Sequence, residues 1–213
     1  MKITIYDWRL EQLLSRLKGS PHWKPPVLHQ FTELLDQFLR FLYDRFDAQA
    51  DRYGGRSAYL GPPKPNADGK TQPWPEKALQ DDLLQQLSAV LTPDTVRREQ
   101  IDVASGRTDI TYTPEPGRRY VIEVKRRLTT ATPSGVEHDY LAQAANYTAT
   151  GPPFGILAVG DHSDHRGGYS DFEDRTWIIQ HARSPTEIPR LIVAGVLPIG
   201  RPTPSATSRP RRH

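Results

Sequence analysis

The chain has no cysteine among its 213 residues. This absence excludes a disulfide framework, a thiolate zinc site and a cysteine nucleophile. No apolar run approaches the roughly 20 residues that a membrane-spanning helix needs. The first residues also lack the apolar core and the cleavage site of a signal peptide. We therefore expect a soluble, cytoplasmic protein.

The excess of positive charge is concentrated at the C-terminus. The formal net charge is +3 and the sequence pI is about 9.2. The last 13 residues contain four arginines and no acid, so the preceding 200 residues sum to −1. We predict a disordered Arg/Pro-rich tail over residues 199–213. The basic pI is a property of this tail and says little about the folded part.

Two amphipathic helices are predicted in an N-terminal helical region over residues 1–55. The first covers residues 5–18, and the second starts at Pro25-Pro26 and runs to about residue 52, with apolar residues at three- and four-residue steps. This periodicity fits a helical hairpin packed on the main domain. It also fits a homodimer or partner-chain interface through residues 26–52, and the sequence does not choose between the two.

A Pro/Gly-rich linker is predicted over residues 56–75, and a main domain over residues 76–198. Within this domain the apolar pattern changes from helical to alternating. The predicted elements are a helix over 76–91; strands over 95–103, 108–113 and 119–125; a helix over 136–149; strands over 154–160 and 175–180; and a short helix near 186–194. This order indicates an α/β fold with a mixed central sheet flanked by helices.

Three side chains on neighbouring predicted strands indicate chemistry. Alternation places Glu123 and Lys125 on one face of their strand, among aliphatic residues. Hairpin pairing can bring Asp109 of the preceding strand beside Glu123. Two adjacent carboxylates repel each other unless a cation lies between them, and Mg²⁺ suits such a pair. Lys125 can then orient a water nucleophile or stabilise charge developing on a phosphate, which indicates hydrolysis of a phosphodiester by metal-activated water.

The spacing of these residues resembles the signature of the PD-(D/E)xK nuclease superfamily. Asp109 is followed, after thirteen residues, by Glu123-Val124-Lys125, while Thr108 stands where the family name records proline. The resemblance covers about residues 76–180, where the predicted order matches the αβββαβ core of the superfamily.

This resemblance implies a restriction-endonuclease-like core and a Mg²⁺-dependent nuclease, in which Mn²⁺ can substitute. It implies Asp109 and Glu123 as metal ligands, the main-chain oxygen of Val124 as an additional ligand, and Lys125 as the group that orients water.

Two further features are similar to members of the superfamily. Gln143 and Tyr147 lie four residues apart on one helix face, as in the Gln-x-x-x-Tyr motif of RecB-like members, where these side chains bind nucleic acid or order the site. Many members also carry a glutamate on the first core helix that points at the metal. Glu76 fits that role, and Asp81 and Asp82 compete for it.

Basic side chains bracket the proposed catalytic strand at Arg118, Arg119, Arg126 and Arg127. They are candidates for phosphate contacts that position DNA without reading bases, or they are ordinary solvated charges. The His- and Asp-containing segment 160–165 follows a buried strand, and we predict an exposed loop there rather than a zinc site.

The sequence as a whole predicts a metal-dependent nuclease that hydrolyses DNA, in prokaryotic restriction, defence or repair by resemblance to the family. A catalytically inert DNA-binding or assembly subunit with the same fold remains an alternative, as does an RNase. DNA is the expected partner in the first two cases and RNA in the third.

Overall fold

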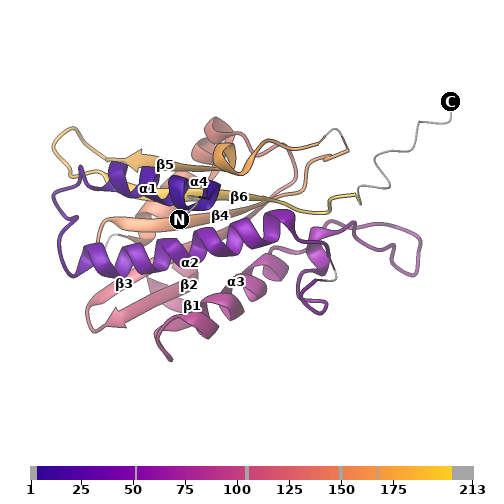
Figure 1. Cartoon of the computed structure of the whole chain (residues 1–213), viewed down its shortest axis with the longest axis horizontal. Helices are drawn as coiled ribbons and strands as arrows, with labels where there is room; N and C mark the ends of the chain where they lie inside the picture. Colours follow the sequence, from indigo (N-terminus) through magenta and orange to yellow (C-terminus); the bar gives the residue numbers. More distant parts are fainter. Residues whose placement is uncertain (1–3, 51, 104–105, 149–150, 167, 203–213) are drawn as a thin grey trace.

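The computed structural model describes residues 4–50, 52–103, 106–148, 151–166 and 168–202 (Figure 1). The sequence also predicts a turn at Ser105-Gly106, between the first two strands of the main domain, and this turn lies partly outside the described residues. The helices are α1 (Ile5–Leu17), α2 (Val27–Asp47), α3 (Glu76–Val90) and α4 (Pro133–Tyr147), with short 3₁₀ turns at Ala58–Leu60 and Phe172–Arg175. The strands are β1 (Val96–Val103), β2 (Gly106–Glu115), β3 (Arg118–Arg127), β4 (Phe154–Asp161), β5 (Thr176–His181) and β6 (Arg190–Pro198).

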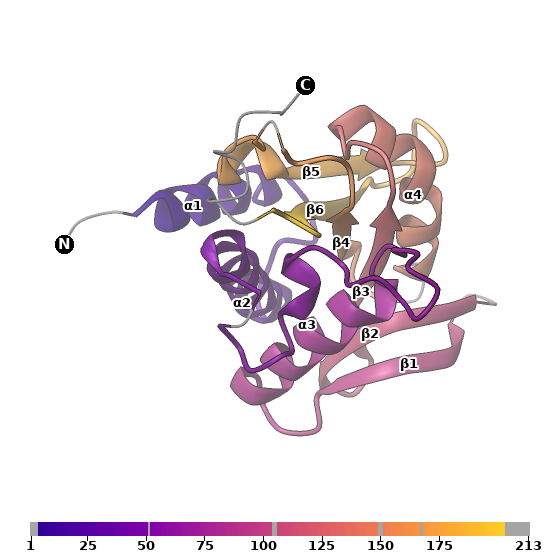
Figure 2. The same ribbon diagram turned by 90° about the vertical axis from the view of Figure 1, so that its right-hand side faces the viewer.

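The strands form one mixed sheet in the order β1-β2-β3-β4-β6-β5. The central strands β3, β4 and β6 are parallel, and the outer strands pair antiparallel with their neighbours. Figure 2 shows α1, α2 and α3 on one face of the sheet and α4 on the other. The predicted α/β class with a mixed sheet and flanking helices is therefore confirmed.

The strand β6 replaces the short helix that we predicted near residues 186–194, so that prediction is wrong. Residues 191–197 are continuously apolar or glycine and are buried throughout. β6 pairs with β4 on one side and with β5 on the other, and helices cover both faces of the sheet. A strand buried on both faces loses the alternation that identifies strands in a sequence, and periodicity alone cannot tell it from a buried helical segment.

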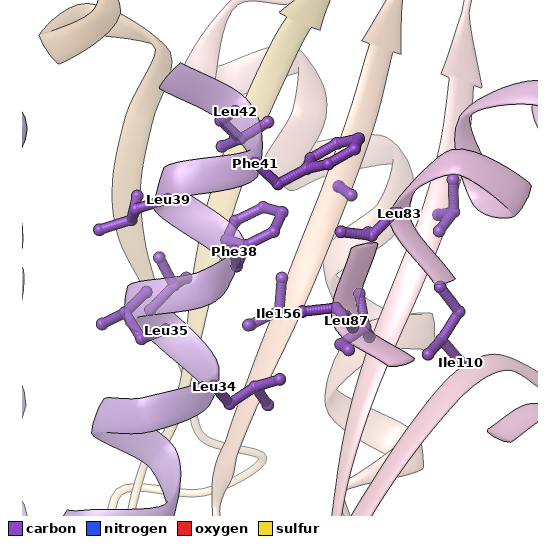
Figure 3. Close-up of a cluster of buried hydrophobic side chains, with 14 of the residues drawn as sticks. Leu34, Leu35, Phe38, Leu39, Phe41, Leu42, Leu83, Leu87, Ile110 and Ile156 are labelled. Atoms are coloured by element: carbon purple, nitrogen blue, oxygen red, sulfur yellow. The ribbon is translucent and has the colours of Figure 1, made fainter. Parts of the chain in front are cut away.

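The apolar face of α2 packs against the sheet and α3, as the close-up of this cluster shows (Figure 3). Phe38 and Leu42 lie over β6 at Gly195, where a Cβ atom would come 2.7 Å from the Cζ atom of Phe38 and closer still to Leu42. The face that was also considered for a dimer is thus covered by the chain's own sheet. This packing agrees with the first of the two interpretations, and a dimer or partner-chain interface through residues 26–52 stays a prediction.

The chain segment after β6 is packed as far as Pro202. Ile199 is buried, and the main-chain N–H of Arg201 donates to the carbonyl oxygen of Leu60 at 2.7 Å. The guanidinium of Arg201 donates to the carbonyls of Arg45, Phe46 and Ala48 at the end of α2. The tail predicted from residue 199 is therefore ordered over residues 199–202, and residues 203–213 lie outside the described part of the chain.

The segment predicted as a linker over residues 56–75 also contributes to the core, because Tyr59 and Leu60 are fully buried. Because the segment is rich in proline and glycine, the sequence indicated a linker and did not indicate that these two residues are buried. No helix in the described residues is long and apolar enough to cross a membrane.

Candidate functional site

The antiparallel register of β2 and β3 brings the predicted acids together. Ile110 pairs with Ile122, so Asp109 and Glu123 are the next positions along the two strands. Lys125 follows two residues later on the same face of β3. Its Nζ atom lies 2.5 Å from Oε1 of Glu123 and 3.8 Å from Oδ2 of Asp109. The structure thus places all three side chains in one cluster, which we call the acid–lysine cluster.

The neighbours of Glu123 in the sheet show why the carboxylate is buried. Ile122 and Val124 pack into the core shared with α1–α3, so alternation turns Glu123 to the opposite face. There it is paired with Leu157 of β4, which packs with α4. Only 1% of the Glu123 side chain is exposed. The sheet therefore holds a carboxylate in surroundings that disfavour its charge.

Burial, reinforced by the neighbouring Asp109 carboxylate, raises the pKa of Glu123 to about 7, although Lys125 acts in the opposite direction. Burial alone lowers the pKa of Lys125, but the carboxylates of Glu123, Asp109 and Glu76 outweigh it and raise that pKa. Oε2 of Glu123 is buried and has no hydrogen-bond partner among the described residues. Lys125 therefore compensates the excess negative charge only in part.

Main-chain N–H groups of β3 hold two of the carboxylates at the site. Val124 donates its N–H to Oδ2 of Asp109 at 2.8 Å. Arg126 donates its N–H to Oε2 of Glu76 at 2.8 Å. Glu76 is the first residue of α3, so the start of this helix is attached to the strand that carries Lys125.

The other two acids considered for the first helix have different roles. Asp81 is exposed to solvent in part and pairs with Lys77 and Arg98. Asp82 is buried on the side of α3 that faces α2, where it forms two hydrogen bonds with Arg45. Of the three acids, Glu76 is the one that the structure places beside the acid–lysine cluster.

The remaining predicted residues are only partly brought to the site. Gln143 is exposed on α4, which covers the same face of the sheet as Glu123. Tyr147 is the last residue of α4, and its side chain lies outside the described part of the structure.

The four arginines are divided between the two ends of β3. Arg118 pairs with Glu115 at the start of the strand, and Arg119 follows it. Because strands rise about 3.3 Å per residue, both lie more than about 13 Å along the strand from Glu123. Arg127 binds the carbonyls of Thr130 and Gly135 and pairs with Asp139. Arg126 is exposed and lines one cavity with Lys125 and Glu76, although it lies on the other face of β3 from Glu123 and Lys125.

Two residues at one side of the site were not predicted from the sequence as part of it. Trp74 and His162 line a small cavity of about 10 Å³ together with Glu76, Lys125 and Arg126. Such a volume holds about one water molecule. These residues come from a Pro-rich segment and from the loop after β4, so no periodicity connects them to β3.

The loop after β4 is less exposed than predicted. Asp161 is fully buried and pairs with Arg175, while His165 is buried against the carbonyl of Asp161. Burial, with Arg126 nearby, lowers the pKa of His162 to about 4. Across the described residues, no group of three or more His, Asp or Glu side chains is arranged to hold a metal ion, here or in the acid–lysine cluster.

Comparisons with protein-family models, with curated proteins and with solved structures find no match for this chain. The function of the chain is therefore inferred from the site itself.

Proposed function

We propose that the chain is a Mg²⁺-dependent nuclease of the PD-(D/E)xK type that hydrolyses DNA phosphodiester bonds within a restriction-endonuclease-like core. The observation that carries the proposal is the acid–lysine cluster. Asp109, Glu123 and Lys125 come from two paired strands, and the Nζ atom of Lys125 lies within 4 Å of both carboxylates. Glu76 adds a third carboxylate at the edge of the cluster.

The donor set fits Mg²⁺, with Mn²⁺ as a substitute. Mg²⁺ prefers oxygen ligands and binds through one or two carboxylates, completing its shell with water and substrate phosphate. Asp109 and Glu123 would supply the carboxylates, and the main-chain oxygen of Val124 a third ligand. The buried Oε2 atom of Glu123, which has no hydrogen-bond partner among the described residues, supports this assignment because an unsatisfied buried carboxylate oxygen is costly.

The chain's own residues account for the remaining parts of the reaction. Lys125 is positioned to orient the attacking water and to offset the charge that develops on the phosphate. Asp109 and Glu123 keep Lys125 in its charged form. A bound Mg²⁺ would supply Lewis-acid activation of the water and of the phosphate. Arg126, exposed beside the cluster, would contact a neighbouring phosphate.

A cleavage assay with a matched pair of variants tests the proposal. Purified protein is incubated with plasmid DNA, linear DNA and RNA, in Mg²⁺, in Mn²⁺ and in chelator. Asp109→Asn should reduce metal-dependent DNA cleavage at least about 100-fold, because it removes a ligand charge from the reaction centre. Asp81→Asn is the control, since it removes the same charge from an exposed ion pair and should retain activity within about twofold.

Three results would contradict the proposal in distinct ways. Undiminished cleavage by Asp109→Asn would remove this residue from the site. Cleavage of RNA alone would make the protein an RNase. DNA binding by the wild-type protein without cleavage in either metal would favour the inert DNA-binding subunit.

A further inference from the structure

The ammonium group of Lys125 lies where a divalent cation would need to bind. Its Nζ atom is 2.5 Å from Oε1 of Glu123 and 3.8 Å from Oδ2 of Asp109, and only 16% of its side chain is exposed. These two carboxylates are also the ones assigned above to the metal. One cation already partly compensates both carboxylates before any metal is present.

The ammonium of Lys125 and a Mg²⁺ ion on the same carboxylate would be close enough to repel each other. Mg²⁺ binds oxygen at about 2.1 Å, so an ion on Oε1 of Glu123 would lie no more than about 4.6 Å from the observed position of Nζ. Charges at this separation in a mostly buried site repel strongly, because little solvent screens them. Coordination through the second oxygen, Oε2, would keep the ion on the same buried carboxylate, so the ion and the ammonium would still share one negative charge.

We propose that Lys125 competes with the divalent cation for the Asp109–Glu123 pair. In the metal-free protein the ammonium holds the two carboxylates together, and it leaves Glu123 when the metal binds. Lys125 therefore weakens metal binding, and its release frees the ammonium to face the substrate phosphate. This inference rests on the proposed metal site and adds to it an order of events, in which the metal displaces the lysine.

The hydrogen bonds around the acid–lysine cluster are compatible with such a displacement of Lys125. Asp109 stays attached to the main chain of Val124, and Glu76 to the main chain of Arg126. Main-chain N–H groups of β3 thus hold the carboxylates of Asp109 and Glu76. Lys125 has a long, flexible side chain and can move without disturbing either contact.

Binding of Mn²⁺, measured by titration calorimetry or by electron paramagnetic resonance without DNA, tests the inference independently of cleavage. Lys125→Gln should bind Mn²⁺ at least about tenfold more tightly than the wild type, because the competing charge is gone. Lys77→Gln is the matched control, because it removes a lysine charge from an exposed position next to Glu76 and should change the Kd less than about twofold. Asp109→Asn should weaken binding about tenfold or more.

The outcomes separate this inference from the proposed function. If Asp109→Asn weakens Mn²⁺ binding and Lys125→Gln does not strengthen it, the competition is overturned and the metal site stands. If neither the wild type nor any variant binds Mn²⁺, both the metal site and the competition are overturned. Lys125→Met provides a second uncharged variant of similar length in case Lys125→Gln does not fold, and the same comparison applies to it.

Discussion

Buried charges in this protein fall into two groups according to how well they are compensated. Arg45 and Asp82 form two hydrogen bonds, and Tyr59 donates a third to the same carboxylate at 2.8 Å. Glu123 is equally buried but has one close cation, and its Oε2 has no partner among the described residues; Nη1 of Arg45 has none there either. The first arrangement fixes α2 to α3, whereas the second belongs to the proposed metal site.

Arg45→Ala should destabilise the protein by about 3–5 kcal/mol, because it leaves the Asp82 carboxylate buried without its cation. Urea denaturation monitored by circular dichroism measures the change. Arg40→Ala is the control on the same helix, where the ion pair with Asp36 is half exposed, and it should cost no more than about 1 kcal/mol. Equal losses for the two variants would show that burial of the Arg45–Asp82 pair has no special role.

Individual residues differ in how far the sequence could place them. Asp109, Glu123 and Lys125 were predictable as a group, because strand alternation and hairpin pairing bring them close together. Their exact register was not predictable, because the turn at Pro116-Gly117 alone would place Asp109 opposite Val124, and a register shift between Tyr112 and Glu115 brings it opposite Glu123. The choice among the acids of α3 was not predictable. It depends on which face of the helix meets α2 and which end meets β3, and the sequence of the helix carries neither piece of information.

At the scale of elements, the contact between α2 and β6 joins the N-terminal helices to the parallel strands of the sheet. The helices α1, α2, α3 and α4 were predictable from their periodicity and flanking prolines and glycines, with ends shifted by a few residues. Strand β6 was not, because its burial on both faces removed the alternating pattern. The packing of α2 on β6 could not be predicted either, since it depends on the space that Gly195 leaves for Phe38 and Leu42.

Gly195→Ala should destabilise the protein by about 1–3 kcal/mol, because the added methyl group would overlap Phe38 and Leu42, both of which are buried and have little room to move. Thermal and urea unfolding measure the loss. Gly19→Ala is the matched control, because its added Cβ would have only an ordinary contact at 3.7 Å. It should leave stability unchanged or raise it by up to about 1 kcal/mol. A neutral Gly195→Ala variant would mean that α2 packs less closely on β6 than described.

At the scale of the whole molecule, both ends of the described chain contribute to one hydrophobic cluster with the sheet. The C-terminal segment returns to the end of α2, where Arg201 binds three carbonyl groups that the helix leaves without partners. The sequence suggested a detachable basic tail from residue 199. The sequence could not predict the contacts of Arg201 with α2, because nothing in a sequence distinguishes a buried arginine near the C-terminus from a solvated one.

Deletion of residues 203–213 should change the free energy of unfolding by less than about 0.5 kcal/mol, whereas Arg201→Ala should cost about 2–3 kcal/mol, through the lost hydrogen bonds at the end of α2. Urea denaturation distinguishes the two. The deletion removes three of the four C-terminal arginines. If the protein binds DNA, the salt dependence of its affinity should therefore decrease by up to about three counterions. A large loss of stability from the deletion would assign residues 203–213 a structural role.

The two main-chain hydrogen bonds at the acid–lysine cluster also affect the entropy of binding. The amides of Val124 and Arg126 orient the carboxylates of Asp109 and Glu76 as soon as β3 and α3 are in place. Their rotational freedom is lost during folding, and little of it remains to be lost when a ligand arrives. The sheet thus preorganises these two acids before a ligand arrives.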